Sequence, residues 1–242
     1  MRVCAVIPAA GRGTRLGSDR PKILTPVTAQ DTIWSILYAK LAPLVDHIHL
    51  ILSHEGAAAI PPLPIHVSHS IQPTPAGMGD TIFRGFDVWS HYDVMLIVWG
   101  DQLFVSADTL SRTLAALQMP DRHMVLPLTR MATPYVEYVF DGPRLTEVLQ
   151  TREGDATTAN GRCDVGTFLL GTRDLKPAWE TYLATEPHGS TTGEINFLPF
   201  LPYLSARGWA VTPLEVADAT EARGINTQDD LAFFQSLYKN RP

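Results

Sequence analysis

The residues whose chemistry stands out first lie near the amino terminus, where Gly11 and Gly13 are followed by Arg15 and Lys22. Glycines let backbone N–H groups close around phosphate oxygens, because no Cβ blocks the approach. Arg15 adds a planar guanidinium that matches phosphate geometry, and Lys22 adds a compact positive charge. The segment therefore predicts a phosphate-binding loop.

Spacing tests two common phosphate-binding motifs against this loop. A Walker A loop needs glycine, four residues and then Gly-Lys-Ser or Gly-Lys-Thr, and the chain has no such string. A dinucleotide fingerprint needs a third Gly or Ala at position 16, where Leu16 stands. The loop therefore belongs to neither class, and the missing Walker lysine disfavours a kinase.

A second candidate is Asp101, in the string Trp99-Gly100-Asp101. It follows the apolar run 94–98, which predicts a buried strand, so Asp101 is expected at the carboxyl edge of a sheet. A carboxylate oxygen at that edge suits Mg²⁺, which binds one or two protein oxygens together with substrate phosphates. Asp101 is therefore the first predicted metal ligand.

Elements that position these residues can be predicted from apolar periodicity. Short apolar runs alternate with helical patterns, which indicates βαβ units around a parallel sheet. The expected strands are 3–8, 47–53, 67–70, 94–98, 165–170 and 209–214. The expected helices are one N-capped by Asp31, then 81–90, 106–118, 175–184, 195–206 and 228–238. Loops are expected at 56–64 and 73–79, and an antiparallel hairpin is expected from 135–140 and 145–149.

These patterns predict an α/β, Rossmann-like fold with a mostly parallel central sheet flanked by helices, in one domain over residues 1–242. Within it, Gly11-Arg12-Gly13-Thr14-Arg15, five residues and then Pro21-Lys22 resembles the signature of nucleotidyltransferases that make NDP-sugars. The chain is most similar to the uridylyltransferase domain of the bifunctional N-acetylglucosamine-1-phosphate enzyme, and the resemblance extends over nearly its whole length.

The resemblance implies the nucleotide-diphospho-sugar transferase fold and a Mg²⁺-dependent transfer of a nucleoside monophosphate with release of pyrophosphate. Arg15 would bind the departing pyrophosphate and Lys22 the reacting phosphates, with Asp101 as the third catalytic residue. Asn226, in Glu221-Ala222-Arg223-Gly224-Ile225-Asn226, resembles the residue that supplies the second metal oxygen. The nucleotide-binding positions that it implies are Ala9, Ala10, Gly11, Gly13, Thr14, Gln72, Gly77, Met78 and Gly100.

The acceptor positions match the family less well. The resemblance places them at Tyr135, Gln150, Asp164 and Gly166, in the expected hairpin region over the acceptor site. Gln150 stands where the family has Glu, and Asp164 begins a string where it has Asn. A pocket built for particular hydroxyls rejects other partners, because its buried polar groups would be left unpaired. We therefore expect an acceptor other than N-acetylglucosamine 1-phosphate.

Two donors and several acceptors remain open. The donor is expected to be UTP or CTP, and the acceptor another sugar 1-phosphate or a similar small phosphorylated molecule. One alternative is a CTP-dependent cytidylyltransferase acting on a phosphocholine-like or phosphonate acceptor. A rival of another class is a catalytically silent subunit that binds nucleotide as a sensor, although the presence of Arg15, Lys22, Asp101 and Asn226 argues against it.

Composition limits the remaining classes. The 242 residues are 45% hydrophobic and 18% charged, typical of a globular protein, and the net charge of -6 comes without a basic run that would indicate nucleic-acid binding. Two cysteines, no apolar run long enough for a membrane span and no signal-like start predict a cytoplasmic protein without a membrane partner. The chain ends at Pro242 without a hexapeptide β-helix, so no acetyltransferase activity is expected. The sequence indicates no particular oligomeric state.

Overall fold

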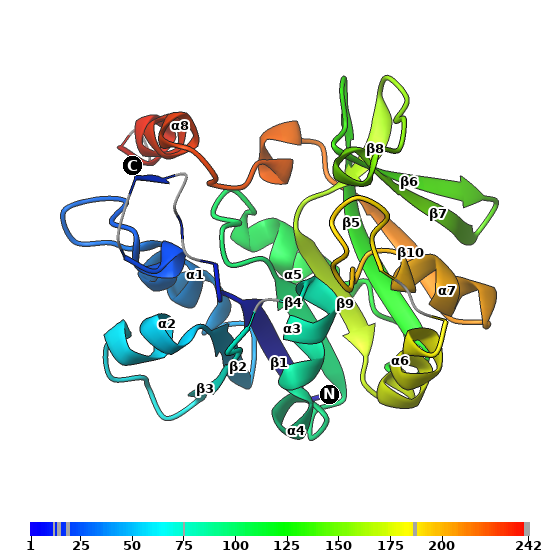
Figure 1. Cartoon of the computed structure of the whole chain (residues 1–242), viewed down its shortest axis with the longest axis horizontal. Coiled ribbons are helices and arrows are strands. Elements are labelled where there is room, and N and C mark those ends of the chain that lie inside the picture. The colour runs from blue at the N-terminus through cyan, green and yellow to red at the C-terminus, as the bar shows by residue number, and fades with distance from the viewer. Residues whose placement is uncertain (12, 14–15, 18–19, 75, 186–187, 240–242) are drawn as a thin grey trace.

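A computed structural model describes the whole chain except residues 12, 14–15, 18–19, 75, 186–187 and 240–242. Within the described part, the central sheet has eight strands in the order β10-β5-β9-β4-β1-β2-β3, and β8 also pairs with β5. The strands are β1 (Val3–Pro8), β2 (His47–Leu52), β3 (Val67–Ile71), β4 (Val94–Val98), β5 (His123–Met131), β8 (Gly161–Asp164), β9 (Thr167–Gly171) and β10 (Ala210–Glu215). The arrangement is shown in Figure 1.

The pairing makes this a mixed, mostly parallel sheet. β1 lies between β2 and β4 and is parallel to both, and β10 is parallel to β5. β9 runs antiparallel to β4 and β5, and β8 runs antiparallel to β5. β1 and β4 are buried along their whole length, as expected for parallel strands covered on both faces. The predicted fold class is confirmed.

Helices cover the sheet and connect its strands (Figure 1). The α-helices are α1 (Ile33–Leu41), α2 (His54–Ala59), α3 (Met78–Arg84), α4 (Phe86–Trp89), α5 (Ala107–Ala115), α6 (Leu175–Leu183), α7 (Phe200–Ala206) and α8 (Gln228–Lys239). Short 3-10 helices are η2 (Lys22–Leu24), η3 (Thr151–Glu153) and η4 (Ala219–Ala222). Among the described residues, no helix combines the length and apolar character that crossing a membrane requires.

Two helix starts differ from the sequence prediction. The N-cap of α1 is Thr32, not Asp31, because Thr32 and Ser35 form a reciprocal capping box in which each side chain accepts a hydrogen bond from the other's backbone N–H. The segment 54–59 is helix α2 and not part of a loop. Its Ser53 N-cap accepts a hydrogen bond from the Gly56 N–H, so the cap outweighs the weak apolar pattern of His-Glu-Gly-Ala-Ala-Ala.

Two predicted helices had wrong boundaries, and two strands were missed. The helix predicted over 81–90 begins at Met78, which the prediction had placed in a loop, and Gly85 divides it into α3 and α4. The helix predicted over 195–206 forms only from Phe200. Strands β5 and β8 were not predicted, since β5 carries His123, Pro127 and Arg130 within its run and lacks a clear apolar alternation.

The expected hairpin is present and separate from the central sheet. It consists of β6 (Val136–Asp141) and β7 (Arg144–Gln150), which pair antiparallel in a two-stranded sheet. In Figure 1 this hairpin lies on one side of the molecule and α8 on the other, with the η4 segment between them at the same end. The site described next lies at this end.

Candidate active site

The site begins where two neighbouring parallel strands end. β1 is followed by the glycine-rich loop, and β4 is followed by Trp99-Gly100-Asp101. The Gly100 N–H donates to the Pro8 carbonyl at 3.2 Å, and a Cβ on Gly100 would lie 2.6 Å from that oxygen. Only glycine permits this approach, which brings Asp101 next to the loop.

Lys22, Asp101 and Asn226 meet at this point. The Lys22 ammonium donates to Asp101 Oδ2 at 2.6 Å and to Asn226 Oδ1 at 2.8 Å. Both side-chain oxygens therefore contact the same ammonium group. The distance between the two oxygens cannot exceed the sum of the two hydrogen-bond lengths. The structure thus brings together three predicted site residues from distant parts of the sequence.

Backbone contacts hold Asn226 in this place. The Ile225 N–H donates to the Asp101 carbonyl at 2.9 Å. A Cβ on Gly224 would lie 3.3 Å from the carboxyl carbon of Asp101, so a side chain there would crowd the site. The Glu-x-x-Gly-x-Asn segment therefore packs directly against Asp101.

Glu221 is a residue whose part the sequence did not reveal. Its buried carboxylate accepts a hydrogen bond from the Ser106 N–H at 3.0 Å, and its carbonyl accepts one from the Gln102 amide at 2.5 Å. These bonds fix η4 to the segment that follows Asp101. The sequence feature that could have identified Glu221 is its position at the start of the segment that contains Asn226.

The donor set fits a divalent cation such as Mg²⁺. Asp101 and Asn226 offer hard oxygens that already surround a cation, the Lys22 ammonium. Among the described residues, no group of three or more His, Cys, Asp or Glu side chains forms another metal site. Two protein oxygens suit Mg²⁺, which takes its remaining ligands from phosphates and water.

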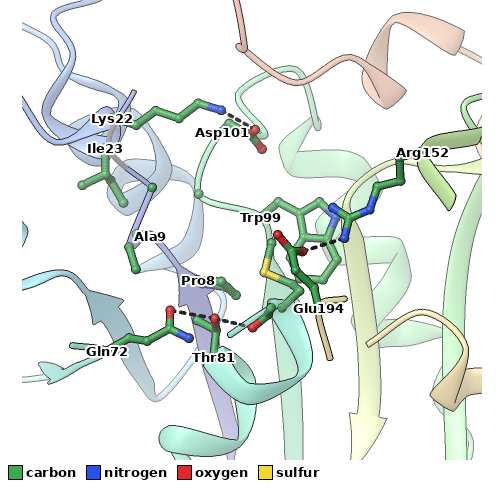
Figure 2. Close-up of a pocket in the computed structure, with 15 residues that line it drawn as sticks. Pro8, Ala9, Lys22, Ile23, Gln72, Thr81, Trp99, Asp101, Arg152 and Glu194 are labelled. Carbon is green, nitrogen blue, oxygen red and sulfur yellow. Dashed lines mark hydrogen bonds and ion pairs between the residues drawn. The ribbon is translucent and has the colours of Figure 1, made fainter. Parts of the chain in front are cut away.

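A cavity of about 610 Å³ opens beside these residues. It is lined by most of the residues predicted to bind nucleotide, together with Lys22, Thr81, Trp99 and Asp101 (Figure 2). The predicted nucleotide residues among them are Ala9, Ala10, Gly11, Gln72, Gly77, Met78 and Gly100. Gly13 does not line it, but its positive φ of 71° lets the loop lie close to Lys22.

The Gln72 side chain is held in one orientation at the wall of this first cavity. Its amide nitrogen donates to Asp80 at 2.9 Å, and its carbonyl accepts from the Thr81 hydroxyl at 2.9 Å. An amide has two donor hydrogens and a carbonyl with two lone pairs, so one donor and one acceptor position remain for a ligand. Figure 2 shows Gln72 and Thr81 at the end of the cavity opposite Lys22 and Asp101.

Gly77 and Gly79 join this wall to the loop that contains Ile195. The Ile195 N–H donates to Ala76, and the Gly79 N–H donates to Ile195, both at 2.9 Å. A Cβ on Gly77, whose φ is 112°, would lie 2.6 Å from the Ile195 carbonyl oxygen. Glycine is therefore required at position 77 by both backbone conformation and space.

Arg152 and Glu194 line the other side of the first cavity and were not predicted. The Arg152 guanidinium donates to Glu194 at 2.6 Å (Figure 2). It also donates to the Asn196 side chain at 2.7 Å. Glu153 accepts hydrogen bonds from Thr192 and Asn196 and so fixes the same loop. A basic residue three positions after the second strand of the predicted hairpin was the available signal.

A second cavity, of about 650 Å³, meets the first at Trp99 and Asp101. Its walls come from η4, α8 and the ends of β4 and β5. The residues that line it are Trp99, Asp101, Gln102, Met131, Tyr135, Ala219, Thr220, Ala222, Arg223, Gly224, Asn226, Asp230 and Phe233. Asp101 is therefore exposed to both spaces.

Of the four predicted acceptor residues, only Tyr135 lines the second cavity, and its hydroxyl donates to the Ala222 carbonyl at 3.1 Å. Gln150, Asp164 and Gly166 line neither cavity. Gln150 is buried at the end of β7. These three positions are therefore not brought to the space beside Asp101.

Asp164 and Gly166 instead support Trp99. The buried Asp164 carboxylate accepts the Gly166 N–H at 2.7 Å and the Tyr138 hydroxyl at 3.1 Å. Burial raises the pKa of Asp164 to about 6, although these two hydrogen bonds act in the opposite direction. The Trp99 N–H then donates to the Gly166 carbonyl at 2.9 Å. The pair thus holds the residue that separates the two cavities.

Two further predicted residues, Thr14 and Arg15, lie outside the described residues. The remaining predicted catalytic pair, Lys22 and Asp101, is in direct contact. A mostly parallel sheet that carries a glycine-rich loop and a carboxylate on adjacent strand ends is typical of nucleotide-binding α/β proteins. The comparisons with known proteins agree with this class.

The chain belongs to the family of the MobA-like NTP transferase domain, which matches residues 5–185, and it is a nucleotidyltransferase. Over 241 residues it is 27% identical to the bifunctional protein GlmU of Acidithiobacillus ferrooxidans, a match that covers 98% of this chain and 52% of that protein. The chain thus spans about half the length of the curated relatives it matches. The resemblance inferred from the sequence is confirmed.

Solved structures show the same fold. The inositol-1-phosphate CTP transferase from T. maritima is similar with a TM-score of 0.72 and 18% identity, over 99% of this chain and 95% of that chain. The 4-diphosphocytidyl-2C-methyl-D-erythritol synthase from Anaerococcus prevotii is similar with a TM-score of 0.68 and 15% identity, over 99% of both chains.

Proposed function

We propose that this nucleotidyltransferase transfers the nucleoside monophosphate unit of a pyrimidine nucleoside triphosphate to a sugar 1-phosphate or a similar small phosphorylated acceptor. The observation that carries the proposal is the convergence of Lys22, Asp101 and Asn226 at the junction of two cavities. Such a junction provides room for two substrates on either side of one charged centre.

The transfer requires no nucleophile from the protein. An oxygen of the acceptor's phosphate forms a bond to the α-phosphorus of the triphosphate. The bond from that phosphorus to the oxygen bridging to the β-phosphorus breaks, and pyrophosphate leaves with the electron pair. The acceptor oxygen is already anionic, so positioning and charge neutralisation account for most of the catalysis.

Lys22 is proposed to bind the reacting phosphates. Its ammonium is partly buried and forms an ion pair with Asp101, a residue that lines both the first and the second cavity. We keep the proposal that Arg15 binds the departing pyrophosphate and that Thr14 belongs to the nucleotide loop. A positive charge is needed here because the chain as a whole carries a net charge of -6.

Asp101 and Asn226 would hold Mg²⁺ through one side-chain oxygen each. When bound, this ion would neutralise charge on the phosphates during the transfer. The two residues' own part is to fix the oxygens beside the loop, through the Ile225–Asp101 backbone bond and the Glu221 anchor. The Lys22 ammonium would then leave the Asp101 and Asn226 oxygens and bind phosphate oxygens instead.

Gln72 is proposed to bind the base of the donor. Its amide retains one donor and one acceptor position, which matches a pyrimidine edge. Gly77 and Met78 would provide backbone contacts at the start of α3. Two of the similar solved structures carry names that indicate cytidine chemistry, which supports CTP beside UTP as a donor.

A two-part experiment tests the proposed function. Thermal shifts with UTP, CTP, dTTP, GTP and ATP show which nucleotide binds, because a ligand of the native state raises the Tm. Pyrophosphate release is then measured with each bound nucleotide and a panel of small phosphates. Release with a pyrimidine triphosphate supports the proposal, whereas binding without release from any pair would favour the silent sensor.

A further inference from the structure

None of the residues proposed to bind the nucleotide lines the second cavity, yet Asp101 does. Building on the proposed function, we propose that this cavity binds the acceptor, that Arg223 binds the acceptor's anionic group, and that the acceptor is a compact phosphate or phosphonate with few hydroxyls. This placement differs from the acceptor positions predicted from the sequence, three of which line neither cavity.

Arg223 is fixed at the wall of the second cavity by two contacts. Its Nε donates to Asp230 Oδ1 at 2.8 Å, and its guanidinium carbon lies 4.4 Å from the centre of the Phe233 ring. No described residue accepts a hydrogen bond from its terminal nitrogens. These nitrogens form the planar donor pair that binds phosphate or phosphonate oxygens best.

The position of Arg223 relative to the reacting centre suits a residue that binds the acceptor's anionic group. It is adjacent in sequence to Gly224, whose backbone packs against the Asp101 carboxylate. An anion held by Arg223 therefore lies in the cavity that Asp101 lines. Of the charged side chains that line this cavity, Asp101 and Asp230 are acidic, so Arg223 supplies the positive charge that an anionic ligand needs.

Arg152 is the alternative anion-binding residue, and two of its three nitrogens already donate to acidic or amide side chains. It lines the first cavity, where one terminal nitrogen donates to both Glu194 and Asn196. Binding an anion there would require separating it from the Glu194 carboxylate. Arg223 keeps its terminal nitrogens available without such a loss.

The hydroxyl and carboxylate groups of Tyr135, Thr220 and Asp230 in the walls of the second cavity already have hydrogen-bond partners. The Tyr135 hydroxyl donates to Ala222, and the Thr220 hydroxyl donates to Asp218. The Asp230 carboxylate accepts from Arg223 and from the Asn226 and Thr227 N–H groups. The volume of about 650 Å³ admits either kind of acceptor. Hydroxyls without partners in such a space disfavour binding, so polarity selects the acceptor with few hydroxyls.

The test compares two arginine variants with a control in the pyrophosphate-release assay. Arg223→Gln and Arg152→Gln each remove one candidate charge, and Arg207→Gln, on the exposed end of α7, is the control. Phosphocholine and 2-aminoethylphosphonate are the compact probes. Glucose 1-phosphate and N-acetylglucosamine 1-phosphate are the polyhydroxylated probes. Arg223→Lys, which keeps the charge, is measured with a melting curve in case Arg223→Gln does not fold.

We expect Arg223→Gln to raise the acceptor KM by about 10- to 100-fold, as for loss of a charge-assisted hydrogen bond, with the nucleotide KM unchanged. Arg223→Lys should show a smaller rise, and Arg152→Gln should leave the acceptor KM near that of the control. The compact probes should exceed the sugar phosphates in kcat/KM by about 10²-fold or more.

Three results would overturn this inference while leaving the proposed function intact. They are a rise in acceptor KM with Arg152→Gln instead of Arg223→Gln, a rise in nucleotide KM with Arg223→Gln, and better turnover of the sugar phosphates. Failure of the proposed function is distinct, because the unmodified protein would then bind nucleotide and release no pyrophosphate with any probe.

Discussion

The ammonium of Lys22 lies 2.6 Å from the carboxylate of Asp101, and this ion pair joins the glycine-rich loop after β1 to the end of β4. The same ammonium also contacts Asn226 at 2.8 Å. One cationic side chain thus occupies the space between two oxygens that are predicted to hold a metal ion. Under the proposed function, binding of nucleotide and metal would move Lys22 from these side-chain oxygens to phosphate oxygens.

Replacing Lys22 with Met should reduce kcat by about 10²-fold, because one group that stabilises the charge of the transition state is lost. Folding should change little, since the pair is only partly buried and such pairs contribute little to stability. Pyrophosphate release and a melting curve measure the two effects. Lys176→Met, on the exposed face of α6, is the control. Unchanged turnover in Lys22→Met would remove Lys22 from the reaction.

Replacing Gly77 with Ala should weaken nucleotide binding and destabilise the protein by about 2 kcal/mol or more, because both φ and space oppose a side chain. The added Cβ would meet the Ile195 carbonyl oxygen at 2.6 Å. Gly142→Ala is a matched control, since Gly142 also has a positive φ but no atom within 4 Å of its Cβ position. Chemical denaturation and nucleotide titration check the comparison. Equal effects of both substitutions would contradict the close contact with Ile195.

Replacing Glu221 with Ala should cost about 1–3 kcal/mol of stability, because the Ser106 N–H would lose its partner. Activity should fall as well, since η4 carries the segment that places Asn226 beside Asp101. Glu221→Gln retains a carbonyl oxygen and should restore part of both. If Glu221→Ala lowered the Tm while kcat stayed at the original value, η4 would not position Asn226.

Stability should fall as the pH drops from about 6.5 to 4, with His49 as a main cause. Burial, together with the neighbouring His47 and His69, lowers the pKa of His49 from 6.5 to about 4. The unfolded chain then binds more protons within this window, so the free energy of unfolding decreases with falling pH. At about 1.4 kcal/mol for each pKa unit, His49 accounts for about 2–3 kcal/mol.

His49→Gln should flatten this pH profile, and His91→Gln, at an exposed position, should leave it unchanged. Asp164 acts with the opposite sign. Burial raises its pKa from 3.8 to about 6, so its contribution to stability decreases as the pH rises through that range. Asp164→Asn should therefore steepen the loss of stability at low pH. Urea unfolding at several pH values measures all three slopes, and parallel profiles for His49→Gln and the original chain would contradict this assignment.

Sequence reasoning predicted the positions of two candidate site segments, because both follow the ends of buried strands. The glycine-rich loop and Asp101 each follow a short, wholly apolar run, and the carboxyl ends of parallel neighbours must meet. Asn226 was found by its resemblance to a known motif, since no spacing argument links it to Asp101. The predicted strands at 3–8 and 94–98 agree with β1 and β4 for the same reason.

Three predicted acceptor positions line neither cavity, because successive residues of a strand face opposite sides and packing decides which side is open. Asp164 faces Tyr138 and the Gly166 N–H in the interior, so its carboxylate is used to hold the chain that supports Trp99. Arg223 lies in a segment whose conformation depends on Asp230 and Phe233, which follow it along the chain. The sequence next to Asp164 or Arg223 does not predict either set of contacts.

The most direct test of the central claim, that Asp101 and Asn226 form the reacting centre with Lys22, is pyrophosphate release by Asp101→Asn and Asn226→Ala in the presence of Mg²⁺. Asp108→Asn, on the exposed face of α5, is the control. The account predicts that both variants still fold and that kcat falls by about 10²-fold or more, as for the loss of an electrostatic stabiliser. Turnover of either variant at the rate of the control would contradict the claim.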